Sequence, residues 1–120
     1  MAGHSGEWDL RIYVLEDTRR VLALSVLPLN VPEERRGAMC ETLNRANFGL
    51  VVGNFELDMD SGEVRCRTAV DLEGAVLSPS LLRHVLQANV EITDTYHPAI
   101  MRVAFGEQAP AEAVAAVEAG

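Results

Sequence analysis

Apolar and polar residues alternate along residues 8–16, WDLRIYVLE. One face of this stretch would carry four apolar side chains: Trp8, Leu10, Ile12 and Val14. A period of two is typical of a strand that buries one face. Four polar residues follow at 17–20, and then the nearly continuous apolar run VLALSVLPL at 21–29. We predict that this run is a central strand that folds back beside the first.

Two later stretches, residues 50–58 and 63–74, have the same period of two and predict a second strand pair. Between them, the sequence DMDSGE at 58–63 supplies the residues that favour a tight reversal. Folding the strands about this turn brings their apolar faces together. The opposite charges that would then face each other across the strands are Arg65 with Asp58, and Arg67 with Glu56.

The middle of the chain, residues 30–47, has the signals of a helix. Asn30 is in the position of an N-cap, Pro32 lies in the first turn, and Glu33 completes a capping box. Apolar residues at helical spacing form one narrow stripe, so this helix is expected to lean on a sheet.

A long helix is predicted over residues 77–106, with Ser78 as its N-cap and Pro79 at its first position. Its apolar residues recur with a period of 3.6. The alanine-rich residues 109–119 predict a short terminal helix or a frayed end.

These elements predict an α+β fold in which an antiparallel sheet of about four strands packs on helices. The order is strand-strand-helix-strand-strand-helix. We expect one domain over residues 8–120, preceded by a loose N-terminus at residues 1–7, because 120 residues are near the usual size of a domain.

The formal net charge is −8, from 18 acidic and 10 basic residues, which disfavours binding to nucleic acid. Two arginine pairs, Arg19–Arg20 and Arg35–Arg36, could contact phosphate, but each adjoins acidic residues, so we interpret them as a solvated face. The run at 21–29 is far shorter than the roughly 20 apolar residues that cross a membrane. We therefore predict no membrane partner.

Two cysteines, Cys40 and Cys66, do not make a disulfide framework, and a reducing cytoplasm is the simpler expectation. With His84 and His97 they could be imagined as a zinc set, but no pair has ligand spacing. We predict no metal and no cofactor.

The sequence D-x-D-x-G that begins at Asp58 resembles the start of a calcium loop. An EF-hand loop needs glycine at its sixth position and a bidentate glutamate at its twelfth, where this chain has Glu63 and Ala69. Its flanks also alternate like strands instead of helices. We interpret the stretch as the turn of a hairpin.

Asp94 and His97 are neighbours on one predicted helix and could form a proton-transfer pair, or equally a surface ion pair. Together with Tyr96 they support an alternative prediction, a small-molecule sensor or minor enzyme. A deep pocket lined by all three residues would favour that alternative.

Five short sequences, in order, carry a family resemblance: VPEERR, LNRANF, GNFELD, GEVRCRTAVDLEG and TYHPAIMRV. With their spacing they resemble the YbjN-type domain family, also described as bacterial sensory transduction regulators, over about residues 8–115. The resemblance implies a fold like that of type III secretion chaperones, often dimeric, and a role in regulation or chaperone-like protein binding. It implies no catalytic residues.

One departure concerns the start of the chain. Members of that family usually have an extra helix and strand before the segment that matches WDLRIYVLE, whereas seven residues precede Trp8 here. A truncated chain, a divergent member, or a form in which a partner replaces the missing elements would each explain this.

We therefore predict a non-enzymatic protein-binding regulator or chaperone-like adaptor of a bacterial cytoplasm, which recognises a segment of another protein. We also predict a homodimer, because few helices cover the sheet and exposed apolar area would remain. We expect the dimer to form through the apolar sheet face or the long helix. The candidate contacts lie beside the apolar stripe of that helix: Leu82, Leu86, Ile100 and Met101. The competing possibility is a monomer in which the helices cover the sheet.

Overall fold

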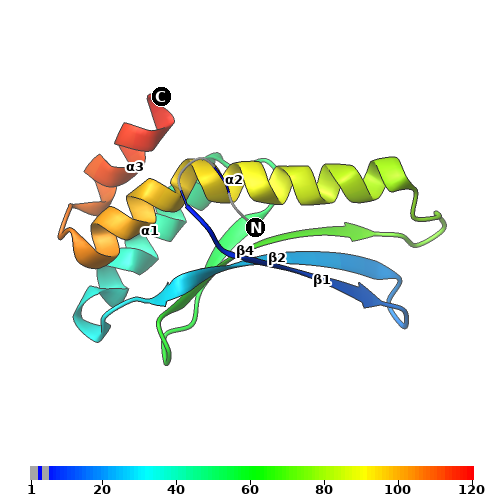
Figure 1. Ribbon diagram of the computed structural model, residues 1–120, viewed down its shortest axis with the longest axis horizontal. Coiled ribbons are helices and arrows are strands. Elements are labelled where there is room, and N and C mark those ends of the chain that lie inside the picture. The colour runs from blue at the N-terminus through cyan, green and yellow to red at the C-terminus, as the bar shows by residue number, and fades with distance from the viewer. Residues whose placement is uncertain (1–2, 4–5) are drawn as a thin grey trace.

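The computed structural model describes residues 3 and 6–120, with the elements arranged as in Figure 1. The strands are β1 (Asp9–Leu15), β2 (Arg20–Asn30), β3 (Asn54–Leu57) and β4 (Glu63–Asp71). The helical segments are the 3-10 turn η1 (Glu33–Arg35) and the helices α1 (Arg36–Gly49), α2 (Pro79–Phe105) and α3 (Pro110–Glu118). The predicted α+β class and the order of elements are confirmed.

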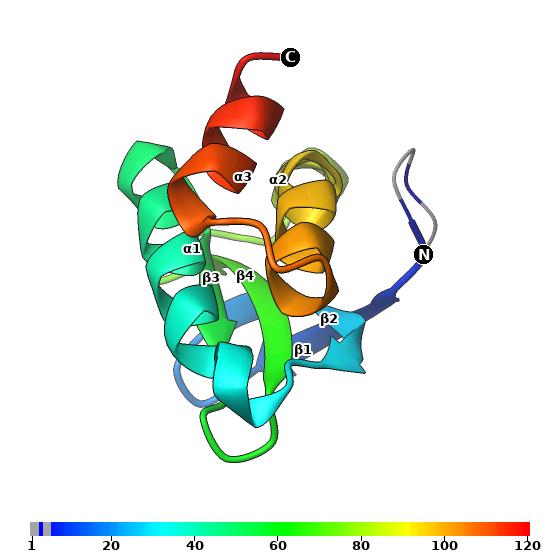
Figure 2. The same cartoon turned by 90° about the vertical axis from the view of Figure 1, so that its left-hand side faces the viewer.

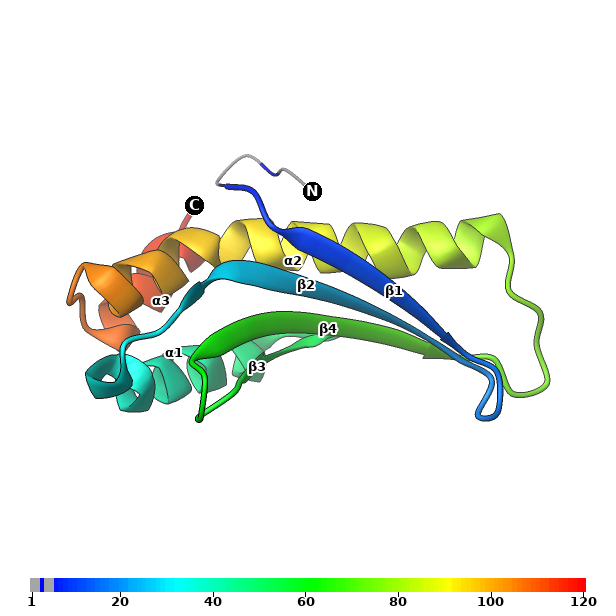
Figure 3. The same cartoon turned by 60° about the horizontal axis from the view of Figure 1, so that its bottom comes forward.

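The strands form one antiparallel sheet in the order β1-β2-β4-β3, so β2 and β4 are central and β1 and β3 are the two edges (Figure 3). The prediction that residues 21–29 form a central strand is confirmed. In the β2–β4 register, Ala23 pairs with Thr68 and Ser25 with Cys66, and all four side chains are buried under the helices.

The three α-helices lie on one face of this sheet (Figure 2). Helix α2 packs against β2 and β4, and α1 packs against β3. Helix α3 packs on α1 and α2 rather than on a strand, so it forms a further layer away from the sheet. No helix of the described residues covers the opposite face of the sheet (Figure 3).

The hydrophobic core lies between the sheet and the helices. It draws on residues from Trp8, which precedes β1, to Val114 in α3. Its members include Leu27, Val31, Met39, Leu43, Phe55, Val64, Tyr96, Ile100 and Val103. Aliphatic side chains therefore dominate the core.

Helix α2 confirms the predicted start, because the Ser78 hydroxyl accepts a hydrogen bond from the Leu81 amide at 3.1 Å and Pro79 is the first helical residue. Its 27 residues span about 40 Å at 1.5 Å per residue, most of the 46 Å length of the molecule.

A buried polar residue fixes α2 over the two central strands. Asn89 is fully buried, and its Nδ2 donates to the carbonyl oxygens of Ala23 in β2 at 3.0 Å and Cys66 in β4 at 3.1 Å. The Ser25 hydroxyl donates to its Oδ1. Buried polar groups need such partners, so a lateral shift of α2 towards β1 would leave the Asn89 amide unsatisfied.

The predicted capping box at the start of the middle helix is wrong. Strand β2 continues through Asn30, whose side chain donates instead to the Ser61 carbonyl at 2.9 Å, across to the β3–β4 turn. The chain then passes through Pro32 and the turn η1, and α1 begins only at Arg36. The Asn30 side chain therefore links the end of β2 to the β3–β4 turn instead of capping a helix.

The predicted register of the β3–β4 hairpin is wrong by two residues, although the predicted ion pair between Arg67 and Glu56 forms. Asp58 belongs to the turn, where its backbone bonds to Gly62 and Glu63, so Arg65 faces Glu56 and Arg67 faces Asn54. The Glu56 carboxylate reaches both guanidinium groups, at 2.7 Å from Arg65 and 3.1 Å from Arg67. Strand β3 is also shorter than predicted.

None of the helices formed by the described residues combines the length and the apolar character that a membrane span requires.

Candidate functional site

The two edges of the sheet differ in length and in exposure. Edge strand β1 has seven residues, and side chains on both of its faces are exposed. The exposed fractions are 47% for Ile12, 41% for Tyr13, 61% for Val14 and 43% for Leu15. Within the described residues, no side chain hydrogen-bonds to the backbone of β1, so the side of its backbone that faces away from β2 is open to pairing.

Part of the prediction for this strand is therefore wrong. Trp8 is buried and Leu10 is half-buried, as predicted for one face, but Ile12 and Val14 on that same face are exposed. The physical reason is the position of α2, which packs on β2 and β4 and leaves the second half of β1 uncovered.

Edge strand β3 is protected instead. It has four residues, and Phe55 on its inner face is only 3% exposed. The side chain of Asn47, at the end of α1, bonds to both backbone groups of Phe55: its Oδ1 accepts from the amide at 2.7 Å, and its Nδ2 donates to the carbonyl at 3.1 Å. Asn47 thus occupies the positions that a neighbouring strand would take.

The open edge ends at a hollow with an acidic rim. A surface hollow of about 510 Å³ lies at the β1–β2 turn, lined by Val14, Leu15, Glu16, Asp17 and Thr18. The open edge therefore combines apolar side chains with two carboxylates at one end.

The predicted interface residues fall into two groups. Ile100 is fully buried in the core of the chain itself, so it is not on the surface. Leu82, Leu86 and Met101 are half-buried, and none belongs to the main core cluster. These three side chains leave some apolar surface on α2, and their role as interface residues stays a prediction.

A family comparison adds to this geometry. The model of the YbjN family, described as "putative bacterial sensory transduction regulator", matches residues 1–102. The chain belongs to the YbjN family. The resemblance seen in the sequence is confirmed, and the family description fits a regulatory role. Comparisons with curated proteins and with solved structures found no match. The predicted likeness to type III secretion chaperones stays a prediction.

In this YbjN-family chain, Tyr96 and His97 make their contacts on different sides of α2. The Tyr96 ring packs edge-on against Phe55, and its hydroxyl donates to Glu118 in α3 at 2.7 Å. Burial and the adjacent Glu118 carboxylate raise the pKa of Tyr96 to about 12. Tyr96 is thus neutral and has a structural role between α2 and α3.

His97 is on another side of α2, where its ring stacks on Trp8 with the ring centroids 6.1 Å apart. Burial lowers the pKa of His97, although the charge of Asp94 opposes that shift. The predicted loose N-terminus is described only at Gly3, Gly6 and Glu7, since residues 1–2 and 4–5 lie outside the described residues. Gly6 lies against His97, because a Cβ at Gly6 would stand 2.6 Å from its ring.

The D-x-D-x-G sequence forms the predicted hairpin turn. Gly62 has φ +83°, and a Cβ at this position would stand 2.5 Å from the Val31 carbonyl oxygen. The Asp58 carboxylate accepts hydrogen bonds from the amides of Asp60 and Ser61, and these bonds lower the pKa of Asp58. Among the residues that the structure describes, no group of three or more His, Cys, Asp and Glu could hold a metal ion.

The arginine pairs interact with backbone carbonyl groups, which the sequence interpretation missed. Arg35 donates to the Val103 carbonyl at 2.8 Å, and Arg36 donates to the Val31 carbonyl at 3.0 Å. Both side chains are partly buried, so the prediction of a wholly solvated face is wrong for this pair. Arg35 thus joins η1 to α2, and Arg36 joins the start of α1 to the residue that follows β2.

Proposed function

We propose that this YbjN-family protein is a regulator that binds an extended segment of another protein at the open edge of its sheet. The contrast between β1 and β3 supports this proposal most strongly. Proteins normally protect the edges of their sheets, and here only β3 has a side chain that bonds to its open backbone within the described residues. A long apolar edge strand is a surface to which a partner strand can add.

The chemistry of β1 defines the segment that it would bind. Exposed apolar side chains on both faces favour a partner strand with apolar residues on both of its faces. Glu16 and Asp17 at the hollow favour an arginine or lysine at the end of that segment. The net charge of −8 adds a general attraction for a basic partner.

The role that we propose is that of a non-enzymatic, chaperone-like adaptor in a bacterial cytoplasm. A regulatory role fits the family description. The buried thiol of Cys66, whose pKa burial raises to about 11, is suited to packing and is not activated as a nucleophile.

We also propose a homodimer through the flank of α2 that carries Leu82 and Leu86. Both side chains are half-buried and lie outside the core cluster, which leaves apolar surface for a second copy. Light scattering at micromolar concentration should give about twice the 13.1 kDa chain mass, and Leu86→Glu should return the mass to that of one chain. A mass near 13.1 kDa for the unaltered protein at every concentration contradicts the dimer.

The protein-binding role is tested by capture from a bacterial lysate on three immobilised proteins: the unaltered chain, Val14→Glu and Val76→Glu. Val14 is 61% exposed in β1, and Val76 is 84% exposed in the loop before α2, so both variants should fold. We expect proteins that bind the unaltered chain and Val76→Glu but not Val14→Glu. Identical sets of bound proteins on all three would contradict the proposal.

A further inference from the structure

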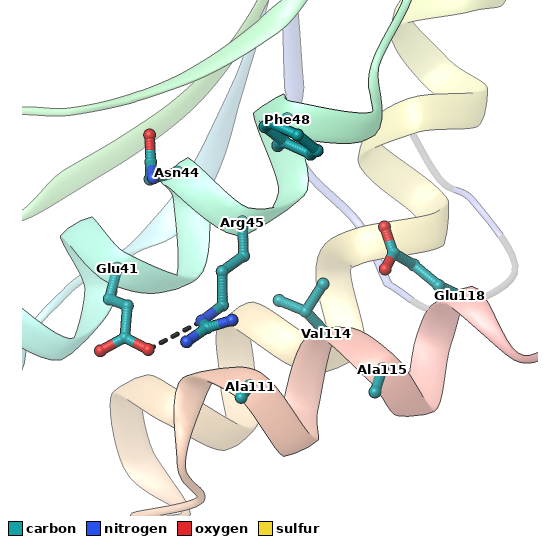
Figure 4. A pocket seen from close by; sticks show the side chains of 8 residues that line it. All are labelled: Glu41, Asn44, Arg45, Phe48, Ala111, Val114, Ala115 and Glu118. Atoms are coloured by element: carbon teal, nitrogen blue, oxygen red, sulfur yellow. Dashed lines mark hydrogen bonds and ion pairs between the residues drawn. The ribbon is translucent and has the colours of Figure 1, made fainter.

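A groove runs along the outside of the molecule between α1 and α3 (Figure 4). Its volume is about 530 Å³. One wall is a single face of α1, formed by Glu41 and the residues three, four and seven positions after it: Asn44, Arg45 and Phe48. The other wall has the same spacing along α3: Ala111, Val114, Ala115 and Glu118. The repeated i, i+3, i+4, i+7 spacing makes both walls straight helix faces.

The two helices run in the same direction, with Glu41 near Ala111 at one end and Phe48 near Glu118 at the other (Figure 4). At that second end, the Glu118 carboxylate lies 3.7 Å from where a Cβ at Gly49 would stand. A trough between two helices that run in the same general direction has a shape that can accept a third helix.

The α3 wall is held in place by specific contacts. Ala113 and Val114 are buried against α1 and α2, and the Tyr96 hydroxyl holds Glu118 at 2.7 Å. At the start of α3, Arg35 donates to the Gln108 carbonyl at 3.1 Å. The groove is therefore formed before any partner binds.

The polarity of the groove changes along its length. At one end, Arg45 forms an ion pair with Glu41 at 2.7 Å, so this end is nearly neutral. At the other end, Phe48 is 94% exposed, and the carboxylate of Glu118 lies across the groove from it (Figure 4). The hydrogen-bond donor of Glu118, Tyr96, is uncharged. A long cationic side chain that lies between an aromatic ring and a carboxylate can contact the ring face and the charge.

This groove lies partly outside the region shared with the family. The family model matches residues 1–102, whereas α3 covers Pro110–Glu118. One wall therefore lies beyond the residues that the family model matches.

We propose that the groove between α1 and α3 binds an amphipathic helix of a partner protein that carries an arginine or lysine over Phe48 and Glu118. The apolar stripe of that helix would lie against the exposed Ala111 and Ala115, and its cation would lie at the acidic end. The net charge of −8 favours a basic helix in the same way. This inference concerns a second surface and does not rest on the proposed role of β1.

The test selects binders from a displayed library of amphipathic helices of about 18 residues, long enough to follow both walls. Selection uses the full chain, with counterselection against Phe48→Glu. Val51→Glu is the matched control, because Val51 is 96% exposed just after α1 but does not line the groove. Circular dichroism confirms that both variants keep their helices.

We expect the enriched helices to have apolar residues at i, i+3 or i+4, and i+7, with an arginine or lysine at one end. Binding to Phe48→Glu should be at least tenfold weaker and binding to Val51→Glu unchanged. Glu118→Gln keeps an acceptor for the Tyr96 hydroxyl but removes the charge, so it should reduce the preference for a basic over a neutral end by about threefold or more.

Three outcomes would overturn the proposal. The first is no enrichment of helical sequences, and the second is enriched helices that bind Phe48→Glu as well as the unaltered chain. The third is self-association that Phe48→Glu abolishes, which would identify the occupant as a second copy of this chain. Val14→Glu should not affect binding of the selected helices. The proposal for β1 and the proposal for the groove can therefore be disproved separately.

Discussion

The two edges of the sheet show how one fold can protect one strand and leave another available. Strand β3 is short, covered by α1, and bonded at Phe55 by the amide of Asn47. Strand β1 is longer, is not covered by α2 along its second half, and has apolar side chains exposed on both faces. Neither edge strand contains a lysine or a proline, two residues that often protect an exposed edge. The difference in protection between β1 and β3 therefore comes from the helices that pack beside them.

The largest expected effect comes from truncating one aromatic residue at each edge. Phe55→Ala should lower the free energy of unfolding by about 3–5 kcal/mol, because Phe55 is 3% exposed and packs edge-on against Tyr96. Tyr13→Ala should change it by only about 0.5 kcal/mol, because Tyr13 is 41% exposed. Urea unfolding measures both variants. Equal losses would mean that the two edges are equally packed.

The backbone protection of β3 is tested by Asn47→Ala. This change leaves the amide and carbonyl of Phe55 without their partner and should lower the free energy of unfolding by about 1–3 kcal/mol. The matched control is Asn44→Ala, one turn earlier on α1, where the exposed side chain should contribute no more than about 0.5 kcal/mol. If Asn47→Ala lost no more stability than Asn44→Ala in the same urea titration, Asn47 would not protect the edge.

Which edge strand is covered and which is exposed was only partly predictable from the sequence. Periodicity predicted the strands and the order of elements along the chain, and Ser78 with Pro79 predicted the start of α2, because each of these depends on neighbouring residues. The exposure of Ile12 and Val14 was not predicted, because it depends on where the amide of Asn89 fixes α2 over the sheet. Asn47 resembled an ordinary helix end, and only its distance to Phe55 reveals its role.

The α1–α3 groove was not predicted either. The alanine-rich residues 109–119 predicted a helix or a frayed end, and periodicity does not tell which neighbour a short helix packs on. The repeat of Glu41, Arg45 and Phe48 on an exposed face of α1 was a signal in the sequence. Without the position of α3, this spacing alone does not predict a groove.

A smaller effect on stability is expected from the ion pairs between β3, the protected edge strand, and β4. Glu56→Gln removes the charge that holds Arg65 and Arg67 and should lower the free energy of unfolding by at most about 1 kcal/mol, because all three side chains are about one-third exposed. The difference should shrink at about 1 M salt, where screening acts over roughly 3 Å. Glu41→Gln, in the more exposed pair with Arg45, serves as the control and should lose less. A loss that salt does not change would exclude the ion pairs as its cause.

The smallest expected effect is a dependence of stability on pH in the β3–β4 turn. Amide hydrogen bonds from Asp60 and Ser61 lower the pKa of Asp58 below the usual 3.8. The folded state is therefore favoured while Asp58 is ionised, and this contribution is lost as the pH falls through 3.8 towards the lower folded pKa.

Asp58→Asn keeps an acceptor but does not titrate. Above about pH 5, the difference in unfolding free energy between the unaltered protein and this variant should be constant. Below that pH, the unaltered protein should lose stability relative to the variant. Thermal unfolding from about pH 6 to pH 2 measures the difference. Parallel curves for the two proteins through the acid range would show that the turn does not favour the ionised form of Asp58.

The central claim is that β1 is the edge at which a partner segment binds, and hydrogen exchange tests it most directly. A partner that distinguishes the unaltered chain from Val14→Glu is added, and amide exchange is measured by mass spectrometry in the free and bound protein. We predict slower exchange in the bound state over β1 (Asp9–Leu15), with no change over β3 (Asn54–Leu57). Unchanged exchange over β1, or protection confined to β3, would contradict the claim.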